Sequence, residues 1–176
     1  MSLEKEIIEY KANGSVHMEN MKSFYEKLDI ETAIKYASTG KNPDDKMNQH
    51  QWRVGYKKGM QGFNELKIEL AEIKKCRKFE DIFLLTEKVK SNIWGLGELW
   101  SYDTALRIGF NLKIYPQQVF VQRGVIKGVK MVLNGKRPKG RSLPINVFPN
   151  ELQVLKAYEI ENFLCIYGKG DKKSVC

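Results

Sequence analysis

Acidic residues are absent from one quarter of this chain. Residues 107–150 contain nine Lys or Arg residues and no Asp or Glu. Of the 30 basic residues in the whole chain, the 21 that lie elsewhere match the 21 acidic residues, so the net charge of +9 comes from this stretch. A dense field of one sign favours a polyanionic partner, for which nucleic acid is the natural candidate.

Histidine, cysteine and long apolar runs are also scarce. Two histidines and three widely spaced cysteines without a CxxC pair argue against a zinc site and a disulfide framework, and no cofactor or metal is predicted. The apolar runs are too short to span a bilayer, and the first residues lack the hydrophobic region of a signal peptide. We therefore expect a cytoplasmic protein without a membrane partner.

The residues that are present indicate a folded, helical protein. A chain of 176 residues with 42% hydrophobic and 11% aromatic content is sufficient for one domain with a real core. Its apolar residues recur at spacings of three and four, without the strict alternation of half-buried strands. We predict an all-α single domain over 1–176, with a helical N-terminal segment over 1–90, a hairpin and basic helical segment over 91–168, and a frayed tail over 169–176.

The apolar spacing and the turn residues place the individual elements. Expected helices cover residues 15 or 17 to 28, 30–36, 60–75, 79–89, 98–109, 119–133 and 149–167. The helix over 119–133 is basic. Residues 134–141, with turn-forming Gly and Pro and four cations, form the one obvious loop.

Residues 93–101 (IWGLGELWS) resemble the helix–hairpin–helix motif, in which two glycines separated by an apolar residue precede a helix. Gly95 and Gly97 occupy the two glycine positions, and Ser101 occupies the small position that lets two helices approach closely. In that family the hairpin binds the DNA backbone without reading sequence. The resemblance therefore implies a contact that positions the protein on DNA.

The chemistry of such a turn suits a phosphate. Glycine permits a positive φ, and the exposed N–H groups of Glu98 and Leu99 at the start of the next helix can bind an anion, helped by the helix dipole. The Glu98 side chain opposes this role unless it turns away. The alternative is a tight interhelical turn in which Trp94 and Trp100 pack in the core.

A wider resemblance is to the helix–hairpin–helix DNA glycosylase superfamily, whose hairpin precedes a basic helical segment. Those enzymes carry a catalytic Asp on the next helix, but residues 116–123 contain no Asp. Leu99 stands where members with lyase activity have Lys. The resemblance therefore implies fold and DNA affinity, and leaves open whether this chain is an enzyme. Residues 102–109 and 161–167 also resemble stretches of uncharacterised bacterial proteins.

The basic residues extend the predicted contact beyond the turn. On a helix, Arg123, Lys127 and Lys130 fall at i, i+4 and i+7, so they share one face. Lys136 and Lys139 add to the charge of the loop. The full predicted DNA-binding set is Gly95, Gly97, Glu98, Leu99, Arg107, Arg123, Lys127, Lys130, Arg137 and Arg141. Such a surface neutralises several phosphates and should bind less tightly as salt increases.

Other constellations leave alternatives open. Asp103 is either a general base with a raised pKa or the partner of Arg107 in a helix ion pair at i+4. His50 is either a proton donor or a structural residue, and Trp52 either stacks on an extruded base or caps the core. The alternative functions are a nucleobase-processing enzyme that uses Asp103 or His50, and a protein-interaction module with an acidic partner. RNA remains open as a substitute for DNA.

Overall fold

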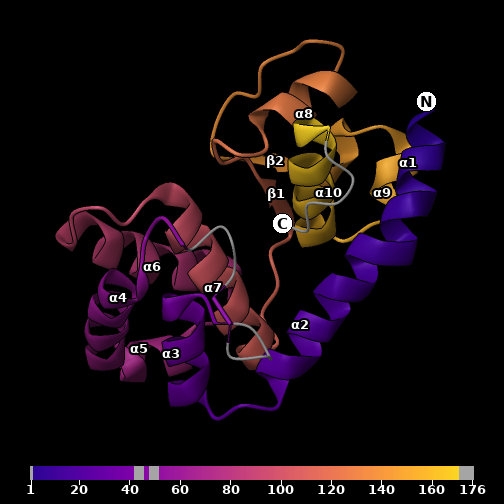
Figure 1. Ribbon diagram of the computed structural model, residues 1–176. Coiled ribbons are helices and arrows are strands. Elements are labelled where there is room, and N and C mark those ends of the chain that lie inside the picture. Colours follow the sequence, from indigo (N-terminus) through magenta and orange to yellow (C-terminus); the bar gives the residue numbers. More distant parts are fainter. Residues whose placement is uncertain (1, 42–45, 48–51, 171–176) are drawn as a thin grey trace. The chain divides into compact units, whose positions relative to one another are not determined.

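Helices make up most of the chain in the computed structural model, which describes residues 2–41, 46–47 and 52–170 (Figure 1). The only sheet in these ranges pairs two strands of three residues each, so the predicted all-α class is confirmed. The chain divides into two compact units. Unit 1 combines residues 2–20 with 116–170, and unit 2 is Met21–Tyr115. These units do not coincide with the segments 1–90 and 91–168 expected from the sequence.

Unit 2 is a bundle of helices. After the end of α2 (Val16–Glu26), it contains α3 (Ile30–Thr39), α4 (Tyr56–Ile68), α5 (Leu70–Lys75), α6 (Phe79–Asn92) and α7 (Glu98–Leu112). The predicted segments 30–36 and 79–89 are correct within a few residues. The single helix expected over 60–75 is wrong, because it begins at Tyr56 and breaks at Glu69 into α4 and α5. The end expected at Gly109 lies at Leu112 instead.

The core of unit 2 lies around α7, which packs against both α3 and α6. Trp100 is 1% exposed, and its indole N–H donates to the carbonyl oxygen of Ser38 at 2.8 Å. Glycines on α4 make this packing possible. A Cβ at Gly59 would lie 2.7 Å from the Ser38 oxygen, and a Cβ at Gly62 would overlap the Trp100 ring. Small residues therefore fix α4 against the neighbouring helices.

Both ends of α3 are capped. At its start the Asp29 carboxylate accepts a hydrogen bond from the Thr32 amide at 3.0 Å. At its end Gly40 has a φ of 70°, the left-handed conformation that glycine adopts at little cost. Asp29 thus caps the free amides at the start of α3, and Gly40 ends the helix at its free carbonyl groups.

Unit 1 is built from both ends of the chain around α10 (Ala157–Lys169). Its other elements are α1 (Leu3–Tyr10), a π-helical turn η1 (Lys11–Ser15), β1 (Gln118–Phe120), α8 (Ile126–Val132), β2 (Ser142–Pro144), a 3₁₀ turn η3 (Ile145–Val147) and α9 (Asn150–Gln153). Residues Ile160, Phe163 and Leu164 of α10 contact the apolar residues of α1, β1 and α8 in one buried cluster. The amphipathic spacing of α10 therefore organises this unit.

The basic helix expected over 119–133 is wrong in its first half. Val119 and Phe120 belong to β1, which pairs antiparallel with β2, and a turn over 123–125 precedes α8. Val125 and Val129 are both fully buried, so α8 packs into the unit through these side chains. The single helix expected over 149–167 is also divided, because a new helix begins after Lys156, whose amide donates to the Glu159 carboxylate at 3.0 Å.

Two glycines hold α8 against α10. A Cβ at Gly128 would overlap the backbone carbonyl of Leu164, and a Cβ at Gly168 would lie 2.7 Å from the Gly128 nitrogen. Backbone atoms occupy the space that side chains would need. The two helices therefore approach as closely as their main chains allow.

Candidate nucleic-acid interface

A tight turn over residues 93–97, here called the glycine turn, joins α6 to α7 in unit 2. Gly95 has a φ of 94°, which a residue with a side chain adopts only with strain. The amide of Leu96 donates to the Ile93 carbonyl oxygen at 3.2 Å, and the Leu96 side chain is buried. One glycine and one apolar anchor therefore determine the path of the turn.

Ser101 allows the two helices that flank the turn to lie close together. It is fully buried, and its hydroxyl donates to the Glu87 carboxylate on α6. In return, the Thr86 hydroxyl donates to the Ser101 carbonyl oxygen at 3.0 Å. The small side chain predicted at this position thus lies fully buried in the contact between α6 and α7.

The N-terminus of α7 presents amides beside the turn. Gly97 is the N-cap residue with φ −108° and ψ 177°, and no side chain caps the helix. A Cβ built on Gly97 meets nothing within 4 Å, so open space lies in front of it. The exposed Glu98 and partly exposed Leu99 begin the helix. Uncapped N–H groups with free space before them are suited to binding an anion.

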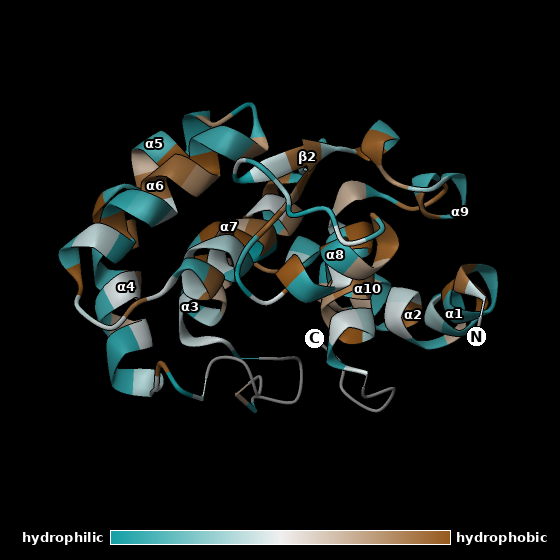
Figure 2. Ribbon diagram, turned by 90° about the horizontal axis from the view of Figure 1, so that it is seen from above, coloured by the Kyte–Doolittle hydropathy of each residue, from teal (hydrophilic) through white to brown (hydrophobic). Residues whose placement is uncertain are grey.

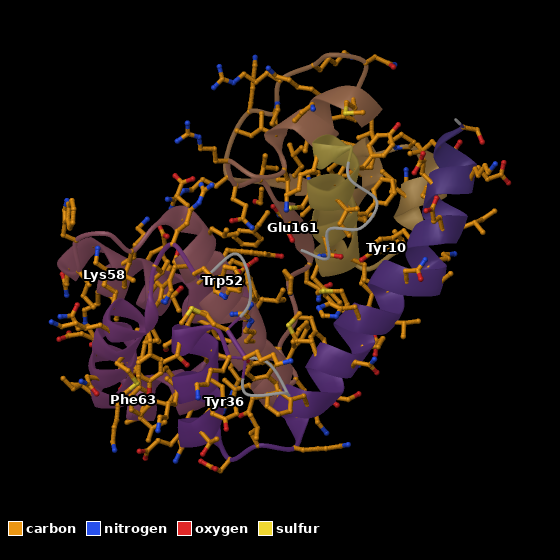
Figure 3. The ribbon with its side chains drawn as sticks, in the orientation of Figure 1. Tyr10, Tyr36, Trp52, Lys58, Phe63 and Glu161 are labelled. Carbon is orange, nitrogen blue, oxygen red and sulfur yellow. The ribbon has the colours of Figure 1, made fainter. Side chains whose placement is uncertain are left out.

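Lys58 and Trp94 flank this turn. The Trp94 side chain is 90% exposed, so the alternative that it packs in the core is wrong, while Trp100 does occupy the core. The Lys58 ammonium lies 4.5 Å from the centroid of the Trp94 ring, and it occupies the space where a Cβ of Gly95 would stand. Lys58 projects from α4 (Figure 3). The glycine turn therefore carries a cation that was not predicted from the sequence.

The predicted basic residues of unit 1 lie on its surface. Lys127 and Lys130 project from α8, and Arg123 precedes that helix in a turn, so the predicted shared helical face holds only for the two lysines. The connection from α8 to β2, which carries Arg137 and Arg141, is drawn mainly in the hydrophilic colour of Figure 2. Within the part of the chain that the structure describes, no carboxylate forms an ion pair with Lys127, Lys130 or Arg137.

Arg107 does not belong to the interface that the sequence predicted. It is 5% exposed in the core of unit 2, where its guanidinium donates to the Ala37 carbonyl oxygen at 3.4 Å. It also lies 3.7 Å from the Asp103 carboxylate, one helical turn earlier on α7. A buried guanidinium cannot reach a phosphate outside the protein. The prediction that Arg107 binds DNA is therefore wrong. The Asp103 carboxylate forms the predicted ion pair with Arg107.

The remaining candidates around residue 50 are only partly described. His50 lies outside the described residues. Trp52 is exposed, and its indole N–H donates to the Met47 carbonyl oxygen at 2.9 Å. The alternative that Trp52 caps a core is therefore wrong for this residue.

A buried polar cluster in unit 1 was not predicted from the sequence. The Gln122 side-chain amide donates to the Glu161 carboxylate at 2.7 Å, and the Ser15 hydroxyl donates to Glu159. Burial, followed by the nearby charges of Glu159 and Glu161, raises the pKa of the Tyr10 phenol well above its usual value. Tyr10 and Glu161 are labelled in Figure 3. Because these groups are enclosed, the cluster serves the interior of the unit and no macromolecule reaches it.

Residues 2–41, 46–47 and 52–170 contain no group of three or more His, Cys, Asp or Glu side chains arranged to hold a metal ion. None of the helices in these ranges has the length and apolar character needed to cross a bilayer.

The chain matches no known protein family, no curated protein and no solved structure.

Proposed function

We propose that the protein binds DNA through its phosphate backbone. The observation that carries this proposal is the exposure of eight of the nine cations in residues 107–150, a stretch without a single carboxylate. Seven of the eight lie in unit 1 between residues 123 and 141. A solvated face that only confers solubility carries mixed charges as a rule, whereas a surface of one sign attracts a polyanion.

The glycine turn of unit 2 supplies a second contact in this proposal. The amides of Glu98 and Leu99 would hold one phosphate, with Gly97 leaving room for it and Lys58 adding charge. A helix N-terminus with an uncapped first turn offers donors without side-chain specificity. We infer that the contact positions the protein and does not read base sequence.

The rival functions have weaker support. A nucleobase-processing enzyme that uses Asp103 would need a carboxylate free to accept a proton, and this one is paired with Arg107. An acidic protein partner would suit the same cations as DNA does. The salt dependence of the affinity distinguishes DNA from an acidic protein. Each phosphate contact releases counterions, so the affinity for DNA falls steeply as the salt concentration increases.

The proposal is tested by fluorescence anisotropy with duplex DNA across a salt series. If all seven cations between residues 123 and 141 contact phosphates, log Kd should change with log salt with a slope of at most about 6 in magnitude. The double variant Lys127→Gln/Lys130→Gln should lower that slope by about 2. The matched control is Lys5→Gln/Lys11→Gln, which makes the same charge change at exposed residues of the same unit.

Three outcomes are possible, and each decides the question. A reduced slope in the first double variant alone supports a local DNA-binding surface. An equal reduction in both variants contradicts a local surface, because net charge alone would then explain binding. No binding of wild-type protein at low salt refutes the proposal. A duplex RNA of the same sequence, run in parallel, shows whether DNA is preferred.

A further inference from the structure

Trp94 is the most exposed of the large hydrophobic side chains that the structure describes. It keeps 90% of its surface accessible, against 77% for Ile68, the next of them. Trp100, six residues later, is almost fully buried and shows that the same segment can enclose an indole. A single exposed apolar residue is common on protein surfaces, so exposure by itself assigns no role to Trp94. Its surroundings do.

The indole is held beside a cation at the glycine turn. Lys58 lies 4.5 Å from the ring centroid, a distance typical of a cation–π contact. Lys58 itself has little freedom at its backbone, because its neighbour Gly59 packs against the main chain of Ser38 and Thr39. That packing fixes the backbone from which the Lys58 side chain extends to the Trp94 ring, while most of the ring remains open to solvent.

The start of the same helix carries a second pair of this kind. The Lys41 ammonium lies 5.8 Å from the centroid of the Tyr56 ring, and Tyr56 is exposed at the first residue of α4. The first turn of α4 therefore takes part in two pairs of a lysine and an exposed ring. It supplies the ring of one pair, Tyr56, and the lysine of the other, Lys58. Interleaved aromatic and basic side chains are typical of surfaces that bind nucleic acid with unpaired bases.

We propose that Trp94 stacks on an unpaired base, so that the preferred ligand carries single-stranded or extruded nucleotides. This inference rests on the proposed function, since the amides at the start of α7 would hold a phosphate of the same strand. Trp94 precedes Glu98, the first residue of that helix, by four positions, and Lys58 adds a cation beside the ring. Paired bases inside a duplex offer no free face to the ring, whereas every unpaired base does. The stacking is therefore selective for structure and tolerant of sequence.

The test compares Trp94→Ala and Trp94→Phe on a thymidine single strand and on a duplex of equal length. Trp94→Ala should weaken binding to the single strand about tenfold or more, Trp94→Phe should retain most of the affinity, and duplex binding should change less than twofold. Ile68→Ala is the control, because it removes the next most exposed large hydrophobic side chain of the same unit, to which no ligand contact is assigned. Thermal unfolding should be unchanged in all three variants, since none of the replaced side chains is buried.

A second measurement reports on Trp94 directly. In a Trp52→Phe background, Trp94 is the exposed tryptophan and Trp100 the buried one, so the single strand should quench the exposed, red-shifted part of the emission. Undiminished single-strand affinity in Trp94→Ala, or an equal loss on duplex and single strand, would overturn the stacking role while leaving DNA binding intact. If the wild-type protein binds neither ligand at low salt, the proposed function itself fails and the inference fails with it.

Discussion

The substitution Gly97→Asp separates folding from phosphate binding, because it should move the two in opposite directions. Gly97 is the N-cap of α7, has an extended backbone that an Asp adopts freely, and faces open space. An Asp carboxylate there can accept hydrogen bonds from the first-turn amides and meets the positive end of the helix dipole. The expected gain in unfolding free energy is about 0.5–1 kcal/mol.

The same carboxylate would occupy the place proposed for a phosphate. Charge-assisted hydrogen bonds are worth about 1.5–3 kcal/mol each, so the loss of this contact should raise the Kd for DNA roughly 10- to 100-fold. The assays are thermal unfolding by circular dichroism and anisotropy at fixed salt. A protein that melts about 2 °C higher and binds more weakly cannot owe its lost affinity to misfolding.

Two companion variants sharpen this experiment. Gly97→Ser provides a cap without the charge and should give a smaller loss of affinity. Glu98→Gln removes the exposed first-turn carboxylate, and should raise affinity about two- to fivefold while slightly lowering stability. A phosphate site at the start of α7 is refuted if Gly97→Asp stabilises the protein and leaves its affinity for DNA unchanged.

Three further results are expected. Arg107→Leu should cost about 3 kcal/mol of stability because it removes the buried guanidinium that pairs with the Asp103 carboxylate. It should leave the salt dependence of DNA binding unchanged, and urea unfolding and anisotropy check the two results. Gly128→Ala should destabilise the protein by about 1–3 kcal/mol in thermal unfolding, since the new methyl group would overlap the Leu164 carbonyl; unchanged stability would contradict the close packing of α8 and α10. Hydrogen bonds from the Thr32 side chain and then its amide lower the pKa of the Asp29 carboxyl. The stability that Asp29 confers is therefore present above its unfolded pKa and lost as pH falls through the folded pKa. Asp29→Asn should make the unfolding free energy depend less on pH below about 4, as urea unfolding at several pH values checks.

The helices could be predicted because their local signals are strong. Asp29 and Gly40 bound α3 with capping chemistry, and the turn with Gly95 and Gly97 separates two amphipathic stretches. Strand β1 escaped prediction because Val119 and Phe120 pair with a segment more than twenty residues later. Periodicity within a window cannot detect a partner outside it, so a basic helix was expected there.

The candidate interface was only partly predictable for a similar reason. The i, i+4 spacing of Asp103 and Arg107 correctly predicts that they pair, but spacing does not say which face of α7 is buried. Lys58 lies 4.5 Å from the Trp94 ring although 36 residues separate them in sequence, and no local pattern links the two. The basic stretch, by contrast, follows from composition alone.

Unit 1 joins the two ends of the chain, and this has a consequence for folding during synthesis. The Tyr10 and Phe163 rings pack edge to face with centroids 5.6 Å apart, and Ser15 bonds to Glu159 across 144 residues of sequence. The apolar face of α1 therefore cannot be buried until α10 has left the ribosome. Unit 2, Met21–Tyr115, is continuous in sequence, so it can fold as soon as Tyr115 has emerged. We expect unit 2 to form first on the ribosome, and the N-terminal helix to need a chaperone's protection in the interval.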